Sequence, residues 1–320
     1  MKPSEIPLDA LFRRLHLANA PRIYRDLCAR AEAEKWSYRD FLAVLVAEEV
    51  AHRSQTRVQR LTRRARLPFL KTIDDFDFTY QSTLRLQMLG SYLSPDFVTD
   101  GKNLILTGKS GRGKTHLAVA IAYRAIQNGF DAIFTTAAAL IDDLSRASRD
   151  GRLSDALDAY VHPHLLVVDE VGYLTYGPDA ANVLFHVVND RHLRKRSMLF
   201  TTNKPLSAWG RVLHDADLAA AIVDRVLERG RLLQLDGPSL RTKHLGLDDP
   251  TLAEASTEPA IISGKPAAEF PEPTALKVST SQCRYCGLKG IPHSIRLILS
   301  VDQMVNATSS VSTRKGSDAS

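Results

Sequence analysis

A glycine-rich segment between residues 108 and 115, GKSGRGKT, has the residue types and spacing of a phosphate-binding loop. It fits the pattern G-x-x-x-x-G-K-[ST], in which glycines let backbone N–H groups fold around phosphate oxygens. Lys114 would reach the β- and γ-phosphates of a nucleotide, and the hydroxyl of Thr115 would hold Mg²⁺. Nucleotide contacts are expected from the loop and the residue after it: Gly108, Lys109, Ser110, Gly111, Arg112, Gly113, Lys114, Thr115 and His116.

Two acids end the apolar run HLLVVDE, residues 164–170. The run is typical of a buried strand, which would carry Asp169 and Glu170 to the carboxyl edge of a parallel sheet, where ligands bind. We expect Asp169 to share the Mg²⁺ with Thr115 and Glu170 to activate water for attack on the γ-phosphate. A kinase does not need a water-activating acid at this place, so the pair favours hydrolysis.

Further polar residues follow along the chain. Asn203 ends the run SMLFTTN and would orient the attacking water, although asparagine at a strand end is also a common turn former. An arginine supplied across a subunit boundary could stabilise transition-state charge. The candidates are Arg225, Arg229, Arg231 and Arg241. Most arginines on helices are only solvated, so the choice among them stays open at this point.

From about residue 100 the chain alternates short apolar runs with amphipathic segments. The expected strands are 102–108, 131–136, 164–170, 197–203 and 231–237, and the expected helices are 114–129, 137–148, 179–193 and 216–229. Strands that alternate with helices imply a parallel sheet covered on both faces. The predicted fold class is α/β, a P-loop NTPase sheet sandwiched by helices and preceded by a small all-α domain, with domains at 1–75 and 76–249.

The predicted N-terminal domain carries a basic stripe. Its second helix should begin at Ser37, which forms an acidic variant of the capping box with Asp40. From Ala51 to Thr72 there are seven Arg or Lys and no Asp or Glu. Charge runs on helices are usually solvated, but this one has no acids to balance it, which favours sequence-tolerant contact with DNA phosphates. The expected DNA contacts are Arg53, Arg57, Arg60, Arg63 and Arg64.

The composition of the whole chain narrows the class of protein and the compartment that are expected. The chain has 320 residues, 44% of them hydrophobic, a formal net charge of +6 and three cysteines, which is too few for a disulfide framework. No apolar run is long enough to cross a membrane, and the few cysteines together with the lack of a signal-peptide pattern predict a reducing cytoplasm. Residues 250–320 are rich in Pro, Ala, Ser and Thr and are expected to be mostly disordered. Cys283 and Cys286 form one CxxC, which is weak evidence for zinc without a second ligand pair.

Several ordered motifs carry a family resemblance. The segments GKSGRGKTHLA, FTTAAALIDDL, LLVVDEVGYL, TTNKPLSAW and AIVDRVLERG…GPSLR resemble the IstB-like transposition helper ATPases, relatives of DnaC-type helicase loaders in the AAA+ superfamily, over residues 8–246. The resemblance implies ATP with Mg²⁺, a homo-oligomer (ring or filament) on duplex DNA, a partner transposase and hydrolysis that remodels or releases the assembly. It also implies that Arg225 reaches a neighbour's nucleotide and that Arg241 lies near a second sensor.

Three other functions remain open on the sequence. A DnaC-type replicative helicase loader would share nearly every motif, and its partner would be a helicase in place of a transposase. A small-molecule kinase would need an acceptor site, which is not evident, and would leave the N-terminal helices unexplained. A nucleotide-gated adaptor with negligible turnover would not need the complete VVDE of residues 167–170.

Overall fold

The computed structural model describes residues 7–81, 83–174 and 176–239. Their contacts divide the chain into two compact units, with the boundary between Thr56 and Arg57. The sequence placed the domain boundary near residue 75, whereas residues 57–75 group with the nucleotide-binding unit in the structure. The two units are referred to below as the N-terminal unit, residues 7–56, and the ATPase unit, residues 57–239.

Three helices make up the N-terminal unit: α1 Leu8–Arg14, α2 Ala20–Ala33 and α3 Tyr38–Arg64, of which α3 continues past the boundary. The predicted capping box at the start of α3 is confirmed, because the Asp40 N–H donates to Ser37 Oγ, at 3.2 Å, and Ser37 Oγ donates to the Asp40 carboxylate, at 2.6 Å. Among the described residues of this unit, only Ala20, Leu45 and Glu49 are buried.

The ATPase unit is built on a five-stranded sheet in the order β2-β3-β4-β1-β5. Its strands are β1 Asn103–Thr107, β2 Ala132–Thr136, β3 Leu165–Val171, β4 Ser197–Thr202 and β5 Gly230–Gln234. All four neighbouring pairs are parallel, as the alternation of strands and helices predicted. Because parallel strands end at one edge of the sheet, the residues that follow β1, β3 and β4 come together there.

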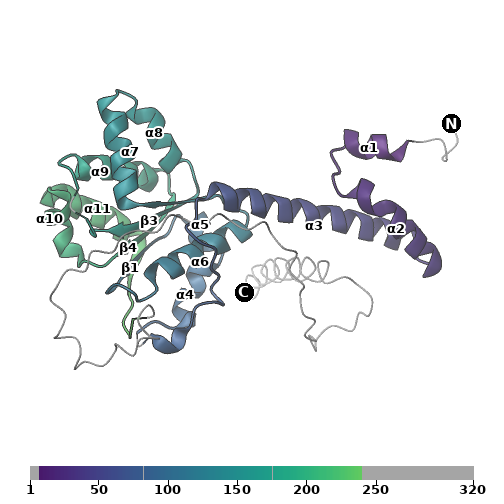
Figure 1. Ribbon diagram of the computed structural model, residues 1–320, viewed down its shortest axis with the longest axis horizontal. Coiled ribbons are helices and arrows are strands. Elements are labelled where there is room, and N and C mark those ends of the chain that lie inside the picture. Colours follow the sequence, from purple (N-terminus) through teal and green to yellow (C-terminus); the bar gives the residue numbers. More distant parts are fainter. Residues whose placement is uncertain (1–6, 82, 175, 240–320) are drawn as a thin grey trace, which may run out of the picture. The chain divides into compact units, whose positions relative to one another are not determined.

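Helices cover both faces of the sheet (Figure 1). One layer contains α4 Leu86–Leu93, α5 Asp96–Thr99 and α6 Lys114–Gln127, together with the end of α3. The other contains α7 Ala137–Arg149, α8 Leu153–Val161, α9 Ala180–Leu193, α10 Trp209–Leu213 and α11 Ala216–Glu228. Two short 3-10 helices, η2 Phe78–Tyr80 and η3 Leu206–Ala208, lie in the connections.

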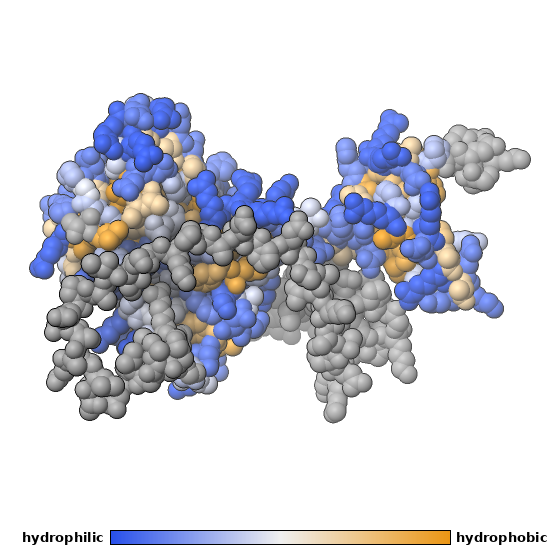
Figure 2. Space-filling view, in the orientation of Figure 1, coloured by the Kyte–Doolittle hydropathy of each residue, from blue (hydrophilic) through white to orange (hydrophobic). Residues whose placement is uncertain are grey.

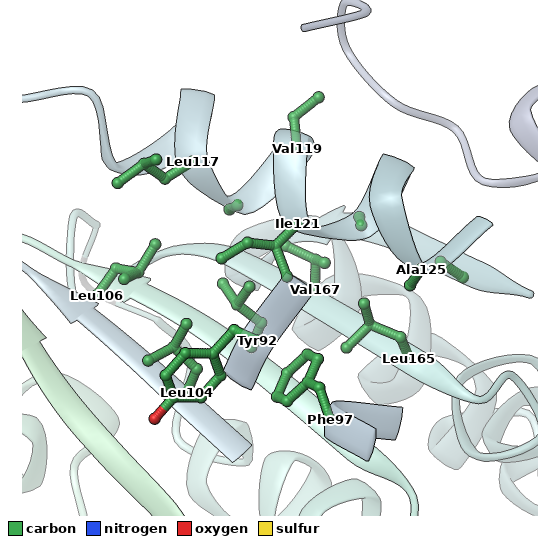
Figure 3. Close-up of a cluster of buried hydrophobic side chains, with 14 of the residues drawn as sticks. Tyr92, Phe97, Leu104, Leu106, Leu117, Val119, Ile121, Ala125, Leu165 and Val167 are labelled. Carbon is green, nitrogen blue, oxygen red and sulfur yellow. The ribbon is translucent and has the colours of Figure 1, made fainter. Parts of the chain in front are cut away.

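Alternation along the strands produces two apolar cores. On β1, Leu104 and Leu106 face the layer of α6, whereas Ile105 faces the opposite layer. Figure 3 shows the first core, in which Leu165 and Val167 of β3 join these β1 side chains beneath α6. The predicted P-loop NTPase fold, with a parallel sheet between two helical layers and helices before it, is therefore confirmed.

The end of α3 belongs to the sheet's first core. Leu61 and Ala65 are buried in it, and the Phe134 N–H of β2 donates to the Ala65 carbonyl, at 2.8 Å. The β2 strand lies at the edge of the sheet, so this bond satisfies a backbone group that an edge strand otherwise leaves open. The basic stripe of α3 thus extends into a helix end that is anchored on the ATPase unit.

Candidate nucleotide-binding site

The phosphate-binding loop connects β1 to α6 at the carboxyl edge of the sheet. Gly108, Gly111 and Gly113 have φ values of 152°, 79° and 85°, a left-handed conformation that glycine adopts without steric cost. A Cβ at Gly108 would clash with the carbonyl oxygen of Leu235, the residue after β5, so this close approach also requires glycine. The loop ends at Lys114, the first residue of α6, whose N-terminus favours bound anions.

Lys114 lies over this loop. Its Nζ donates to the carbonyl oxygens of Gly108, at 2.8 Å, and Lys109, at 2.9 Å. These bonds hold a positive charge among the loop's N–H groups, where the sequence predicted contact with the β- and γ-phosphates. The arrangement fits a polyphosphate, which needs several donors and a cation converging on one point.

Thr115 and Asp169 meet across the gap between α6 and β3. The Thr115 hydroxyl lies 3.0 and 3.1 Å from the two Asp169 carboxylate oxygens, and the Asp169 side chain is buried, with 4% of its surface exposed. A hydroxyl and a carboxylate beside a phosphate loop are the hard oxygen donors that suit Mg²⁺. The predicted pair of metal ligands is thus adjacent in the structure, and the donor set fits the ion.

Glu170 and Asn203 both line the cavity in front of this pair. The cavity has a volume of about 280 Å³, and Ser110, Lys114, Thr115 and His116 line it as well. Asn203 Oδ1 is buried and has no hydrogen-bond partner among the described residues, so a polar acceptor faces the site unused. Because β4 lies between β1 and β3, Asn203 is placed between the phosphate loop and the acids.

Comparison with protein families assigns the chain that carries this site to one of them. The model of the IstB-like ATP binding protein family matches residues 10–246 of the chain. The chain belongs to this family. The phosphate loop, the acids at the end of β3 and Asn203 all lie within the matched region, so the resemblance stated from the sequence is confirmed.

The chain aligns with most of the length of two curated relatives. The chain is similar to the insertion sequence IS5376 putative ATP-binding protein of Geobacillus stearothermophilus, with 34% identity over 74% of this chain and 94% of the relative. It is also similar to the insertion sequence IS21 putative ATP-binding protein of Pseudomonas aeruginosa, with 33% identity over 74% of this chain and 89% of the relative. These names place the IstB-like chain among insertion-sequence ATP-binding proteins.

Solved structures resemble parts of the same chain. One is the DnaC helicase loader, at 26% identity with a TM-score of 0.39, covering 47% of the IstB-like chain and 88% of the loader chain. Another is DnaI, at 20% identity with a TM-score of 0.45, covering 55% of the IstB-like chain and 94% of that chain.

The segment before the sheet forms a wall of the site, although its sequence suggested only a linker. Phe69 lines the cavity, and His116 Nε2 donates to the Thr72 carbonyl, at 3.2 Å. The His116 ring also contacts Phe76 edge-on, with ring centroids 5.1 Å apart. Burial lowers the pKa of His116, which keeps the ring neutral at physiological pH. His116 therefore ties α6 to residues 69–76.

Thr201 and Tyr173 also line the cavity and were not anticipated from the sequence. Thr201 is two residues before Asn203 on β4, so strand alternation places both side chains on the same side. This two-residue spacing from Asn203 is the sequence signal that could have identified Thr201 as a site residue. Tyr173 follows the acids in an exposed turn, and nothing in its spacing distinguishes it from a surface residue.

Arg225 does not line the cavity of its own chain. Its guanidinium lies over the Phe185 ring, 4.7 Å from the centroid, and its Nε donates to Asn189 Oδ1, at 3.2 Å. Phe185 and Asn189 are on α9, and Arg225 also donates to the Ala221 carbonyl within α11, at 3.3 Å, so its guanidinium is held between these two helices. Arg241, Cys283 and Cys286 lie outside the described residues.

The arginines of the basic stripe differ in their surroundings. Arg53 forms an ion pair with Glu49, at 3.0 Å, and Arg57 donates to the Gly129 carbonyl, at 2.8 Å. Arg60, Arg63 and Arg64 are exposed and form no ion pair with any described residue. The five expected DNA contacts thus divide into two arginines with intrachain partners and three that form no ion pair with a described residue.

Two features are absent from the described residues, a membrane-spanning helix and a cluster of metal-binding side chains. Within the described ranges no helix is both long and apolar enough to cross a membrane. The same ranges contain no cluster of three or more His, Cys, Asp or Glu side chains placed to hold a metal ion. The Mg²⁺ donors argued above are a hydroxyl and a single carboxylate, which is the sparse donor set expected where the nucleotide phosphates supply further oxygens.

Proposed function

We propose that this protein is a DNA-stimulated ATPase that serves a transposase. In this proposal it binds ATP and Mg²⁺, assembles as a homo-oligomer on duplex DNA in the cytoplasm, engages the transposase, and uses hydrolysis to remodel or release the assembly. The observation that carries it is the pair of acids at the end of β3, with Asp169 against Thr115 and Glu170 in the cavity. The names of the insertion-sequence relatives supply the setting.

The chain's own residues would perform hydrolysis in a single displacement. The Asn203 amide orients a water molecule, and the Glu170 carboxylate takes its proton as the water oxygen bonds to the γ-phosphorus. The bond from that phosphorus to the bridging oxygen of ADP breaks, while Lys114 and the loop N–H groups balance the charge that develops. When bound, Mg²⁺ would supply further positive charge at the β- and γ-phosphate oxygens.

DNA contact is proposed for the exposed part of the basic stripe. Arg60, Arg63 and Arg64 have no acidic partner among the described residues, so phosphate contacts would relieve their mutual repulsion. Arg53 and Arg57 already bond within the chain and would contribute less. Arginines at regular helical steps suit the phosphate backbone, which predicts binding that tolerates many sequences and weakens steeply with salt.

Arg225 is proposed to act on the nucleotide of a neighbouring subunit. Its position on α11, away from its own cavity, leaves a trans role as the way for it to reach a phosphate. Mixed assemblies of Arg225→Ala and Lys114→Ala chains should then recover activity, because an intact arginine and an intact loop can meet at one interface. Assemblies that recover nothing would exclude Arg225 as the arginine that acts in trans.

The test of the proposed function is the ATPase rate with duplex DNA, with single-stranded DNA and without DNA, each at two salt concentrations. Strong stimulation by duplex that is lost at high salt supports the proposal, since counterion release makes phosphate contacts salt-dependent. Stimulation by single strands alone would favour a helicase loader. A rate that is the same in all three conditions would overturn DNA coupling and favour a kinase or an adaptor.

A further inference from the structure

The backbone of Glu170 has an unusual conformation for a residue with a side chain. Its φ is 61°, in the left-handed region that residues other than Gly, Asn and Asp rarely adopt. The β3–β4 register passes from Val168↔Phe200 to Val171↔Thr202, so two residues of β3 oppose the single residue Thr201. This is a β-bulge, a feature that re-aims a side chain beside a functional site.

Two hydroxyl groups from other parts of the chain hold the bulge. The Glu170 N–H donates to Thr201 Oγ1, at 2.9 Å, and Thr201 Oγ1 donates its own proton to the Asp169 carboxylate. Tyr176 OH donates to the Glu170 carbonyl, at 3.2 Å, and accepts from the Gly172 N–H, at 3.1 Å. Each hydroxyl uses its one donor and an acceptor lone pair, so both backbone polar groups of Glu170 are satisfied.

These two hydroxyls are themselves fixed in place. Thr201 is in the middle of the sheet on β4, with 1% of its surface exposed. The Tyr176 carbonyl accepts from His214 Nε2, at 3.0 Å, and His214 ends α10 just before α11. The bulge is therefore held from the sheet on one side and from the α10–α11 corner on the other.

We propose that Thr201 and Tyr176 are positioning residues that keep the Glu170 carboxylate aimed at the attacking water. The inference rests on the hydrolytic role proposed for Glu170. A left-handed glutamate that lost these bonds would relax toward the extended conformation of a regular strand, which turns its side chain out of the cavity. Neither hydroxyl is assigned contact with the reacting atoms, so both act through Glu170.

Substitutions of Thr201 and Tyr176 should differ in their effect on the Mg²⁺ dependence of hydrolysis. Thr201 also bonds Asp169, so its loss disturbs a proposed metal ligand as well as the bulge. Among the described residues, the Tyr176 hydroxyl forms hydrogen bonds only with the backbone of Glu170 and Gly172. Removal of the Thr201 hydroxyl is therefore expected to raise the Mg²⁺ concentration needed for half-maximal rate, whereas removal of the Tyr176 hydroxyl should leave it unchanged.

The experiment measures single-turnover ATP hydrolysis and ATP affinity for the full chain with saturating duplex DNA. Tyr176→Phe should lower the hydrolysis rate about 10- to 100-fold with ATP affinity unchanged, because small misplacements of a catalytic group cost rates of that order. Thr201→Val should lower it at least as far and shift the Mg²⁺ dependence, and Thr201→Ser should restore both. Tyr160→Phe is the matched control, since it removes a hydroxyl bonded to Asp143 outside the site.

A hydrolysis rate for Tyr176→Phe equal to that of Tyr160→Phe would overturn the proposal. So would an equal loss of rate and ATP affinity, which indicates a general structural defect. Adding Tyr176→Phe to Glu170→Gln should cause no further loss, since a residue that acts through Glu170 has nothing left to position. If Glu170→Gln is inactive while Thr201→Val and Tyr176→Phe are fully active, only the positioning fails. If Glu170→Gln hydrolyses ATP at the parental rate, the water-activating role proposed for Glu170 fails, and the positioning role fails with it.

Discussion

The ATPase unit and the N-terminal unit are stabilised in different ways. In the ATPase unit, two apolar layers enclose the strands, and the site residues project from the ends of those strands. In the N-terminal unit, the buried acid Glu49 accepts the N–H groups of Ala18, Asn19 and Ala20, at 2.8 to 3.0 Å, and so holds the start of α2 against α3. One unit depends on packing and the other on a single charged acceptor.

The surfaces of the two units reflect this difference. Along α3, Tyr38, Leu42, Val46 and Val50 recur at four-residue steps and are exposed, Tyr38 to 96%. Figure 2 shows apolar residues among the polar surface of this unit. A unit that leaves its apolar face open gains little from burial, which explains why Glu49 carries so much of its organisation. The ATPase unit, by contrast, can hold a strained residue such as Glu170 because the hydroxyls of Thr201 and Tyr176 fix its backbone.

The largest loss of stability is expected in the ATPase unit at Arg191. This side chain is fully buried and donates to five carbonyl oxygens, those of Tyr160, Val161, Pro163, His164 and Ser197. Arg191→Gln should lower the free energy of unfolding by at least about 3 kcal/mol, since hydrogen bonds to a charged group contribute about 1.5–3 kcal/mol each.

Denaturation followed by the fluorescence of Trp209, in a Trp36→Phe background, would measure this loss in the ATPase unit alone. Arg194→Gln is the control, because Arg194 is an exposed residue at the end of the same helix and should change stability by less than about 0.5 kcal/mol. Equal effects of the two substitutions would show that the carbonyl cluster does not depend on Arg191.

The same truncation in the two units should have unequal effects. Leu166→Ala, at a position that is fully buried, should cost about 2–5 kcal/mol in the ATPase unit. Leu45→Ala should cost less, about 1–2 kcal/mol, because Leu45 keeps 9% of its surface exposed and belongs to neither apolar core. Hydrogen exchange of the α2 amides would measure the second value, and a cost at Leu45 as large as at Leu166 would contradict the contrast between the units.

A pH-dependent effect is expected at Glu49. Burial raises the pKa of this carboxyl, but the bonds from Ala20, Asn19 and Arg53 outweigh it, and the net pKa is lowered. A lowered folded pKa gives stability that is present above the unfolded value, about 4.3, and is lost as the pH falls through the folded value. Glu49→Gln should cost about 1.5–3 kcal/mol at neutral pH and progressively less below pH 4 or so.

Protection of the Ala18, Asn19 and Ala20 amides against hydrogen exchange, measured from pH 7 downward, would test this. Glu48→Gln serves as the control, since the Glu48 carboxylate forms no hydrogen bond or ion pair with a described residue. The account of the N-terminal unit would be wrong if the Glu49 and Glu48 variants lost protection equally.

The smallest effect on stability is expected for arginines of the basic stripe, whose replacement should have the clearest effect on DNA binding. Arg60→Gln with Arg64→Gln should change stability by less than about 0.5 kcal/mol, as both side chains are exposed. If each contacts one phosphate, the log–log salt slope of duplex binding should become shallower by about 1.8. Arg194→Gln should leave the slope unchanged, and an unchanged slope in the double variant would make the stripe a solvated face.

Much of the ATPase unit could be predicted from its sequence, because the local sequence patterns there match the places that the segments take in the folded unit. The strand before Gly108, the helix after it and the acids after Val168 each have a signature that does not depend on distant residues. The helices α4 and α8 were not anticipated. Neither has a strong boundary signal, because no side chain caps the start of either helix.

The site's supporting contacts could not be predicted, for a related reason. The left-handed Glu170 and its bonds to Thr201 and Tyr176 arise from the register of two strands that meet only in the fold. Glu49 looks in the sequence like any acid on a helix, and only the turn between α1 and α2 gives it three N–H donors. Long-range hydrogen bonds leave no periodic signal.

The most direct test of the central claim is single-turnover ATP hydrolysis by Glu170→Gln on duplex DNA, with ATP binding measured on the same sample. Hydrolysis is expected to fall by about 10²- to 10⁴-fold, the usual contribution of a positioned base, while ATP binding is retained. Lys114→Ala, by contrast, should lose nucleotide binding itself. Hydrolysis by Glu170→Gln at the parental rate would show that the acid at the end of β3 does not activate water.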